Sequence, residues 1–357
     1  FNRIVKFKNF CSLSNRIDMD SETEELLTKT GPSLAFAGAF ATFGNILDNP
    51  VLLQSLGSEA TDLTLTWKDV NVWVNKRTPK HFWSMRHYEE MQILKKVCGV
   101  AKSGSLLAVM GASGSGKTTL LATISKRLKG ERQSGSILLN GKEVDKKLLS
   151  QISGFVPQKD MVIDTLTTQE HLRFMAKMKM DRDTKTLNRR MHLESLLADL
   201  NLTQCKNTRL SDLSGGERKR LSLAVELLTD PPILFCDEPT TGLDSYSAIS
   251  VVEKLRLLAA RGKIVICTIH QPASNIFDYF QELLLLVGGR LAYHGDIHDA
   301  AEFFSSLGYH CPPTYNPADF YLNQLSIVPG KELESQSKAD LLCDEFAASM
   351  YGEYLDK

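Results

Sequence analysis

The chain has 357 residues, of which 43% are hydrophobic, enough to build one large domain with appendages or two domains. Lys plus Arg and Asp plus Glu both number 42, so the overall charge indicates neither nucleic acid nor an anionic membrane as a partner. The seven cysteines are scattered without a C-x-x-C pair, which argues against disulfides or a cysteine-bound metal and favours reduced thiols in the cytosol.

Residues 1–60 show no clear periodicity, and we interpret them as a weakly ordered extension with one short helix near Ser21 to Lys29. No transmembrane helix is expected, because the apolar stretch from Leu34 to Leu47 is too short and contains glycines. No signal peptide is expected, since no continuous apolar run follows the first basic residues. The chain begins with Phe1, which indicates a fragment or a start upstream of an internal Met19.

A folded domain is expected to start where apolar and polar residues begin to alternate. The run from Leu63 to Val74 is typical of a strand with one buried face. Lys76 to Met91 is interpreted as an exposed hairpin insertion, and Ile93 to Val100 as the next strand. Trp67 or Trp73 could stack on an adenine ring or belong to the strand core, and the sequence leaves both interpretations open.

The stretch from Val109 to Thr119 fits the pattern G-x-x-x-x-G-K-[ST], whose backbone cradles nucleotide phosphates. A buried strand at Leu106 to Met110 precedes it, and a helix at Thr118 to Leu128 is predicted to follow. The glycines let peptide N–H groups approach an anion, and the helix N-terminus adds its dipole. The alternative is a Gly/Ser-rich surface turn. The candidate binding residues are Gly111, Ala112, Ser113, Gly114, Ser115, Gly116, Lys117, Thr118 and Thr119.

After this loop, Gly135 to Gly141 is predicted to be a strand that ends in an Asn-Gly turn, and Ile152 to Val156 another strand. The capping box from Thr167 to Glu170 opens a helix at about Thr168. From there to about Leu202 the sequence is predicted to be helical throughout. This part is therefore expected to be a helical insertion.

Strands return further along the chain, with a helix from Tyr246 to Ala260 between the first two of them. The predicted strands are Ile233 to Cys236, Lys263 to Thr268, Leu283 to Val287 and Arg290 to Tyr293. Alternating strands and helices predict an α/β fold with a mostly parallel sheet that is covered on both faces.

Two carboxylates, Asp237 and Glu238, follow the apolar strand that ends at Cys236. Asp237 is predicted to bind Mg²⁺ beside Thr118, and Glu238 to orient or deprotonate the attacking water. The alternative is a solvated turn, which is less compatible with a phosphate loop in the same chain.

The segment from Leu213 to Arg220 places a hydroxyl and two glycines before an apolar helix at Leu221 to Leu228. The N-terminus of this helix forms a second anion site. Because one phosphate loop already serves the nucleotide of this chain, the second site is expected to face the nucleotide of another copy.

These segments together resemble the ATP-binding-cassette (ABC) ATPases. That family combines a phosphate loop with a Gln loop, a signature sequence, a carboxylate strand, a D-loop and a switch His. The corresponding residues here are Gly111 to Thr118, Gln158, Ser214 to Glu217, Asp237 with Glu238, Gly242 to Asp244, and His270. The resemblance covers about Leu63 to Val328. It implies a P-loop NTPase fold with a mostly parallel core sheet, an antiparallel β subdomain and a helical subdomain at about 161–225.

The resemblance also implies ATP and Mg²⁺ as cofactors and assigns roles to the matching residues. Mg²⁺ would be held by Thr118, Gln158 and Asp237, and the catalytic residues would be Glu238, His270 and Gln158. The γ-phosphate would be sensed by His270. The partner subunit's ATP would be contacted by Ser214, Gly215 and Gly216, with Asp244 at the dimer seam.

Cys267 to Pro272, Gly308 to Pro312 and Asn316 to Phe320 are similar to subfamily G half-transporters, above all to the white and scarlet type that carries insect eye-pigment precursors. The resemblance implies a nucleotide-binding domain at 61–328, and a linker or helix at 329–357 that leads toward a transmembrane domain. It further implies a second half-transporter as partner, a location at the cytoplasmic side of a membrane, and small-molecule substrates derived from tryptophan, pteridine or guanine. No nucleic-acid partner is expected.

Two alternatives to a transporter subunit stay open at this point. One is a truncated product that binds ATP without transporting anything. The other is a soluble ABC-type ATPase that acts on ribosomes or DNA, although such proteins carry two cassettes or a long coiled coil, and this chain shows one cassette without sustained heptads.

Overall fold

The structure, a computed structural model, describes residues 63–77, 88–160, 163–181, 184–349 and 352. The described residues belong to one compact unit of the chain. The predicted N-terminal extension, its short helix and most of the predicted insertion after Lys76 lie outside the described residues.

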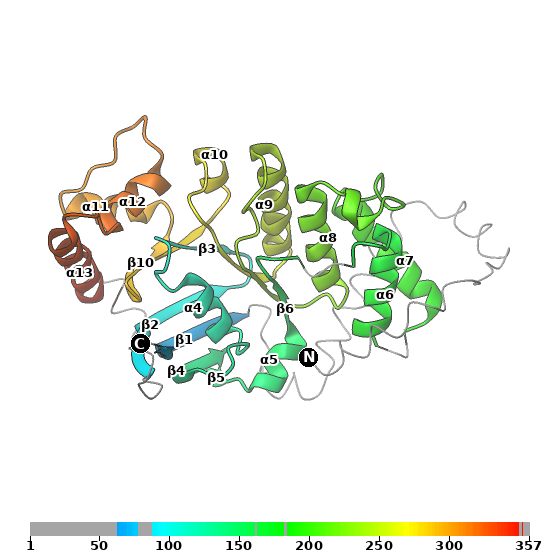
Figure 1. The fold of residues 1–357 in the computed structure, drawn as a ribbon, viewed down its shortest axis with the longest axis horizontal. Helices are drawn as coiled ribbons and strands as arrows, with labels where there is room; N and C mark the ends of the chain where they lie inside the picture. The colour runs from blue at the N-terminus through cyan, green and yellow to red at the C-terminus, as the bar shows by residue number, and fades with distance from the viewer. Residues whose placement is uncertain (1–62, 78–87, 161–162, 182–183, 350–351, 353–357) are drawn as a thin grey trace, which may run out of the picture. The chain divides into compact units, whose positions relative to one another are not determined.

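The described strands form two sheets (Figure 1). The first is four-stranded and antiparallel, in the order β2-β1-β4-β5, and consists of β1 (Thr64–Arg77), β2 (Tyr88–Lys102), β4 (Arg132–Leu139) and β5 (Lys142–Glu143). The second is six-stranded, in the order β10-β9-β3-β8-β7-β6, and consists of β3 (Leu106–Gly111), β6 (Ser153–Val156), β7 (Ile233–Cys236), β8 (Ile264–Thr268), β9 (Glu282–Val287) and β10 (Arg290–Asp296). All its pairings are parallel except that of β9 with β10, so the predicted mostly parallel sheet is confirmed.

The helices lie around these sheets, with α6 and α7 at one end of the described unit and α11 to α13 at the other (Figure 1). They are α4 (Lys117–Ile124), α5 (Lys146–Ile152), α6 (Thr168–Lys179), α7 (Thr186–Asp199), η2 (Leu210–Asp212), α8 (Gly215–Leu227), α9 (Ser245–Ala260), α10 (Ser274–Phe277), α11 (Asp299–Ser306), α12 (Pro317–Leu325) and α13 (Glu332–Ala348).

The six-stranded sheet separates two hydrophobic clusters, and β3 shows how. Leu107 and Val109 belong to the cluster that contains α4, α5 and the antiparallel sheet, whereas Leu106, Ala108 and Met110 belong to the cluster that contains α6 to α13. Successive strand residues point to opposite faces, so a strand covered on both faces is apolar without interruption. The prediction that both faces are covered is confirmed.

Several predicted boundaries are wrong for local reasons. The helix after the phosphate loop ends at Ile124 instead of Leu128, because Lys126 has a left-handed backbone with φ 51°. The stretch from Thr168 to Leu202 contains two helices instead of one, because α6 ends at Lys179 and α7 begins at Thr186. Ile152 is the last residue of α5 and not the first residue of a strand, and α5 was not predicted. Its N-cap residue Asp145, which accepts a hydrogen bond from the Leu148 N–H, was the available signal.

Trp67 is completely buried and lies against Gly99, where a Cβ atom would collide with the indole ring. The adenine-stacking interpretation of Trp67 is therefore wrong, and its ring belongs to the core. Trp73 is half-buried, and the Arg132 guanidinium lies 4.6 Å from the centre of its ring.

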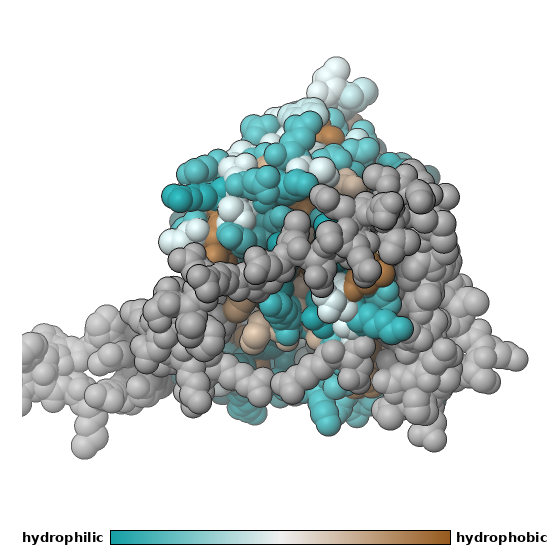
Figure 2. Space-filling model, turned by 90° about the vertical axis from the view of Figure 1, so that its right-hand side faces the viewer, coloured by the Kyte–Doolittle hydropathy of each residue, from teal (hydrophilic) through white to brown (hydrophobic). Residues whose placement is uncertain are grey.

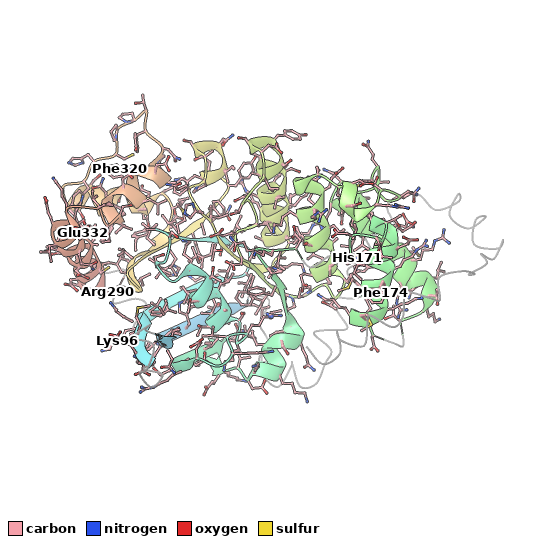
Figure 3. The ribbon with its side chains drawn as sticks, viewed as in Figure 1. Lys96, His171, Phe174, Arg290, Phe320 and Glu332 are labelled. Atoms are coloured by element: carbon pink, nitrogen blue, oxygen red, sulfur yellow. The ribbon has the colours of Figure 1, made fainter. Side chains whose placement is uncertain are left out.

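The last described helix, α13, packs on β10 through buried side chains that include Leu342 and Phe346. Arg290 on β10 lies close to this helix in Figure 3 and pairs with Asp340 and Asp344. Within the linker or helix expected at 329–357, the structure has a helix from Glu332 to Ala348, and its buried side chains pack against its own domain. Among the described residues, no helix is both long and apolar enough to cross a membrane.

Figure 2 shows the side of the unit on which α6 and α7 lie. Hydrophilic residues cover most of the coloured surface, and hydrophobic residues form separate spots between them. The exposed hydrophobic side chains of these helices include Met178, Leu187 and Met191.

His294 links the two sheets, and it gives a testable pH dependence. Its ring contacts the Val100 backbone at 2.9 Å and the Leu283 carbonyl at 3.3 Å, and burial lowers its pKa to about 4. In the unfolded chain the His294 imidazole has its ordinary pKa of about 6.5, so it takes up a proton at a higher pH than in the folded protein. Between pH 6.5 and pH 4, a falling pH therefore favours the unfolded state. We predict that His294 alone lowers the free energy of unfolding by about 2 kcal/mol between pH 7.5 and pH 5.

The measurement is urea unfolding of the wild type and of His294→Gln at both pH values. Burial also lowers the pKa of His171, so the relevant quantity is the difference in slope between the two proteins. Equal pH slopes in the wild type and the variant would contradict the prediction.

Candidate functional site

The phosphate loop connects the buried end of β3 to the first residue of α4 at the carboxyl edge of the six-stranded sheet. Gly114 and Gly116 have φ angles of 78° and 103°, which favour glycine. A Cβ atom on Gly111 would collide with the Leu286 carbonyl and the Ser115 hydroxyl, and one on Gly116 would lie 2.7 Å from Leu94. Gly114 and Gly116 are therefore favoured by their backbone conformation, and Gly111 by the lack of space for a side chain.

Ser115 presents a hydroxyl without a hydrogen-bond partner among the described residues. The residue is 4% exposed, and its Oγ lies within the same loop as the N-terminus of α4. A buried unpaired hydroxyl costs free energy unless a ligand satisfies it. Together with the helix N-terminus, it fits the oxygens of a bound phosphate.

Lys117 folds back on this loop. Its Nζ donates to the Gly111 carbonyl at 2.9 Å and to the Ala112 carbonyl at 3.0 Å, and the residue is 6% exposed. Burial lowers the pKa of Lys117, while the charges of Glu238 and Asp237 act in the opposite direction. A phosphate bound in the loop offers this ammonium group stronger acceptors than the two carbonyls.

Asp237 lies directly after β7, is 5% exposed, and accepts two hydroxyl hydrogen bonds at Oδ1. The donors are Thr118 Oγ1 at 3.0 Å and Thr268 Oγ1 at 2.8 Å. Thr268 Oγ1 also accepts from the Glu238 N–H at 2.8 Å. Thr268 was missed as a site residue, although a hydroxyl at the end of an otherwise apolar buried strand was the available signal.

The oxygens of Thr118 and Asp237 fit a magnesium ion. Their separation of 3.0 Å matches the distance of about 2.9 Å between neighbouring ligands of an octahedral Mg²⁺ with bonds of about 2.0–2.1 Å. The described residues contain no group of three His, Cys, Asp or Glu that could hold a metal. A metal here would need further oxygens from phosphate and water, as Mg²⁺ prefers.

The structure brings Gln158 and Glu238 together. The Glu238 Oε2 accepts from Gln158 Nε2 at 2.7 Å and from Thr241 Oγ1 at 2.9 Å. Glu238 has a left-handed backbone with φ 45°, a conformation that is uncommon for non-glycine residues and occurs both in turns and at functional sites. His270 lies two residues beyond the end of β8 and is exposed.

Ser214 and Asp244 begin two neighbouring helices, α8 and α9, and both are exposed. Ser214 forms a capping box with Glu217, so α8 starts six residues before the predicted Leu221. The Ser247 N–H bonds the Asp244 carboxylate at 3.0 Å and keeps its pKa below the ordinary range. Within the described part of the chain, the hydrogen bonds of Ser214 and Asp244 are local to these helices and do not reach the phosphate loop.

The two glycines of the signature differ in their surroundings. Gly215 is exposed, whereas Gly216 is buried against α9, where a Cβ atom would lie 2.7 Å from the Ser247 hydroxyl. Gly216 therefore has a packing role in the structure, because it allows α8 and α9 to approach each other closely.

Two family models match the chain. Residues 94–241 match the model described as ABC transporter, and residues 270–343 match the model described as ABC-2 type transporter. The first includes the phosphate loop, Gln158 and both carboxylates.

Curated relatives include protein white of Drosophila melanogaster, 44% identical, and protein scarlet of the same species, also 44% identical. Each alignment covers 82% of this chain, with 46% of white and 44% of scarlet. The ABC transporter ATP-binding protein/permease wht-1 of Caenorhabditis elegans is 39% identical over 81% of this chain and 45% of its own length. The chain thus spans about half the length of the curated relatives it matches.

Solved structures agree in fold. An ATP-binding subunit of an ABC transporter superposes with a TM-score of 0.54 at 21% identity, covering 72% of this chain and 98% of that one. A dimeric bacterial ABC transporter cassette gives a TM-score of 0.54 at 26% identity, covering 65% of this chain and 98% of that one. With these matches beside the site geometry, the chain belongs to the ABC transporter family, in the G subfamily of white and scarlet, and carries the ATPase domain of that family.

Proposed function

We propose that the chain is the ATP-hydrolysing part of a G-subfamily half-transporter, which drives small molecules across a membrane. The observation that carries the proposal is the hydrogen-bonded arrangement of Thr118 in the phosphate loop with the buried Asp237 and Thr268, with Gln158 and Glu238 in contact next to it. The similarity to white and scarlet over 82% of the chain supports transport as the purpose of the hydrolysis.

In this proposal the loop at 111–119 binds the phosphates of ATP. Lys117 exchanges its two carbonyl partners for the β- and γ-phosphates, and the Ser115 hydroxyl gains an acceptor. Mg²⁺ would be held by Thr118, Asp237 and the side-chain oxygen of Gln158. When bound, the ion neutralises charge on the phosphate oxygens and helps to align them.

Glu238 is placed to orient the attacking water and to accept its proton. Its carboxylate is fixed by Gln158 and Thr241, which restricts it to one direction at the edge of the sheet. His270 would contact the γ-phosphate and register its loss. The exposed position of His270 leaves its ring accessible to a nucleotide.

A second subunit would complete the site. Ser214, Gly215 and Gly216 lie at the start of α8, and Asp244 caps the neighbouring α9, so these groups would face ATP bound to a partner. The similarity to a bacterial cassette described as dimeric supports this arrangement. ATP would then hold two domains together and release them on hydrolysis.

The resemblance to white and scarlet suggests eye-pigment precursors derived from tryptophan, pteridine or guanine as substrates, and a second half-transporter as the partner. It also suggests that the domain lies on the cytoplasmic side of a membrane. The overlap of residues 270–343 with an ABC-2 type transporter model supports the association with a membrane.

The first prediction concerns Glu238→Gln, which keeps the shape of the side chain and removes its capacity to accept a proton. We expect the ATPase rate to fall by about 10²- to 10⁴-fold, the usual contribution of a general base. Because ATP would be bound but not cleaved, the variant should form an ATP-dependent dimer more readily than the wild type. Size-exclusion chromatography with light scattering measures the dimer, and retained nucleotide is quantified in the same fractions.

The matched control for this variant is Glu302→Gln on α11, an exposed carboxylate that the proposal does not use. It should hydrolyse ATP at the wild-type rate. A Glu238→Gln protein that binds ATP yet stays monomeric at every concentration would show that the dimer mechanism is wrong.

The second prediction concerns Thr268→Val, which removes one donor to Asp237 and leaves the Glu238 N–H unpaired. We expect a loss of about 1–3 kcal/mol in the free energy of unfolding and a higher Mg²⁺ concentration for half-maximal ATPase activity. Urea unfolding and a Mg²⁺ titration measure the two effects. Thr268→Ser keeps the hydroxyl and should show the wild-type Mg²⁺ dependence; a Thr268→Ser protein as impaired as Thr268→Val would contradict the role of these hydrogen bonds.

A further inference from the structure

The ammonium group of Lys219, on α8, is buried in the protein. The side chain is 4% exposed, and Nζ donates to the Gln158 carbonyl at 2.8 Å, to the Pro157 carbonyl at 3.3 Å and to Asp160 Oδ1 at 3.2 Å. These acceptors use all three N–H groups, which is the full satisfaction that a buried charge needs. The sequence analysis gave this residue no role.

Ser222 strengthens the same connection. It lies three residues further along α8, on the same side of the helix, and its Oγ donates to Asp160 Oδ1 at 2.7 Å. Two side chains of α8 thus hold the four residues that follow β6, residues 157–160. Gln158 belongs to this segment, and its side chain binds Glu238 at the site of hydrolysis.

The other end of α8 is the signature. Ser214 caps the helix five residues before Lys219, a rise of about 7–8 Å along the helix axis. An α-helix moves as a stiff unit over this distance, so a displacement of residues 157–160 reaches Ser214 through Lys219. Gln158, which contacts the Glu238 carboxylate, and Ser214, which would face a second copy, are therefore connected through the buried ammonium group of Lys219.

Lys263 provides an internal comparison. It is also buried, with a side chain that is 5% exposed, and its Nζ donates to Asp230 at 2.6 Å and to the Pro231 carbonyl at 2.8 Å. It joins the starts of β7 and β8, at the edge of the sheet opposite to Asp237. The two lysines share their chemistry but differ in position relative to the site.

We propose that Lys219 is a positioning residue that couples Gln158 to the signature helix α8, so that binding of nucleotide at one site sets the position of Ser214 toward the second copy. The inference rests on the proposed function. Lys219 does not touch the nucleotide in this scheme; it acts through the backbone of Gln158.

The test compares Lys219→Met with Lys263→Met in the 357-residue chain. Three quantities are measured: the affinity for a fluorescent ATP analogue, kcat for ATP hydrolysis, and the ATP-dependent dimer in the Glu238→Gln background. For Lys219→Met we expect an affinity within about threefold of wild type, a kcat at least about tenfold lower, and no ATP-dependent dimer. For Lys263→Met we expect a similar loss of thermal stability, with kcat within about twofold of wild type.

Two further variants separate coupling from a general effect on folding. In a double mutant with Gln158→Ala, Lys219→Met should lower kcat no further than Gln158→Ala alone, because both changes act on one connection. Asp160→Asn changes a partly exposed partner and should lower kcat by about threefold or more while the chain stays folded.

Any one of three results would overturn this inference and leave the proposed function standing. They are equal losses of kcat in Lys219→Met and Lys263→Met, additive effects in the double mutant, and an unchanged kcat in Asp160→Asn. A wild-type chain that binds no ATP would overturn the proposed function and this inference with it.

Discussion

The parallel pairing of β3, β8 and β7 is the constraint on which the site depends. Cys236 is paired with Cys267, and Val109 with Thr268, so the residues that follow these strands meet at one edge of the sheet. Ligands of open α/β sheets bind at this carboxyl edge. The register explains why Asp237 comes within 2.8 Å of Thr268, although the two are distant in sequence. A slip of one residue in either strand would turn these side chains to the wrong face.

Buried lysines connect the segments that must act together. Lys117, Lys219 and Lys263 each place an ammonium group on backbone carbonyls within the domain. Lys219 and Lys263 also have an aspartate partner, which compensates their charge permanently. Lys117 donates to two carbonyls, with the carboxylates of Asp237 and Glu238 nearby, so an anionic ligand can replace its hydrogen-bond partners. Lysine thus forms fixed contacts at positions 219 and 263, and contacts that a ligand can replace at position 117 in the phosphate loop.

Much of this could be predicted from the sequence, because the strands are short apolar runs and the motifs stand at their ends. The phosphate loop, the strand before Asp237 and the capping box at Thr167 lie where the pattern placed them. Lys219 was missed because its role comes from contacts between distant segments, which no local pattern contains. Thr268 was missed because its only local signal was a hydroxyl at the end of an apolar strand. The break between α6 and α7 was missed because apolar and charged residues continue through it. Gly216 was assigned to the nucleotide, but its burial against Ser247 also gives it a role in packing, which spacing alone could not show.

The central claim is that one chain holds half of each ATP site, with Lys117 on one subunit and Ser214 on the other. The most direct measurement is the ATPase rate per subunit as a function of protein concentration, with the oligomeric state determined in the same samples. We predict a rate that rises with concentration and levels off when the ATP-bound dimer is saturated. A constant rate per subunit in samples that stay monomeric would contradict the claim.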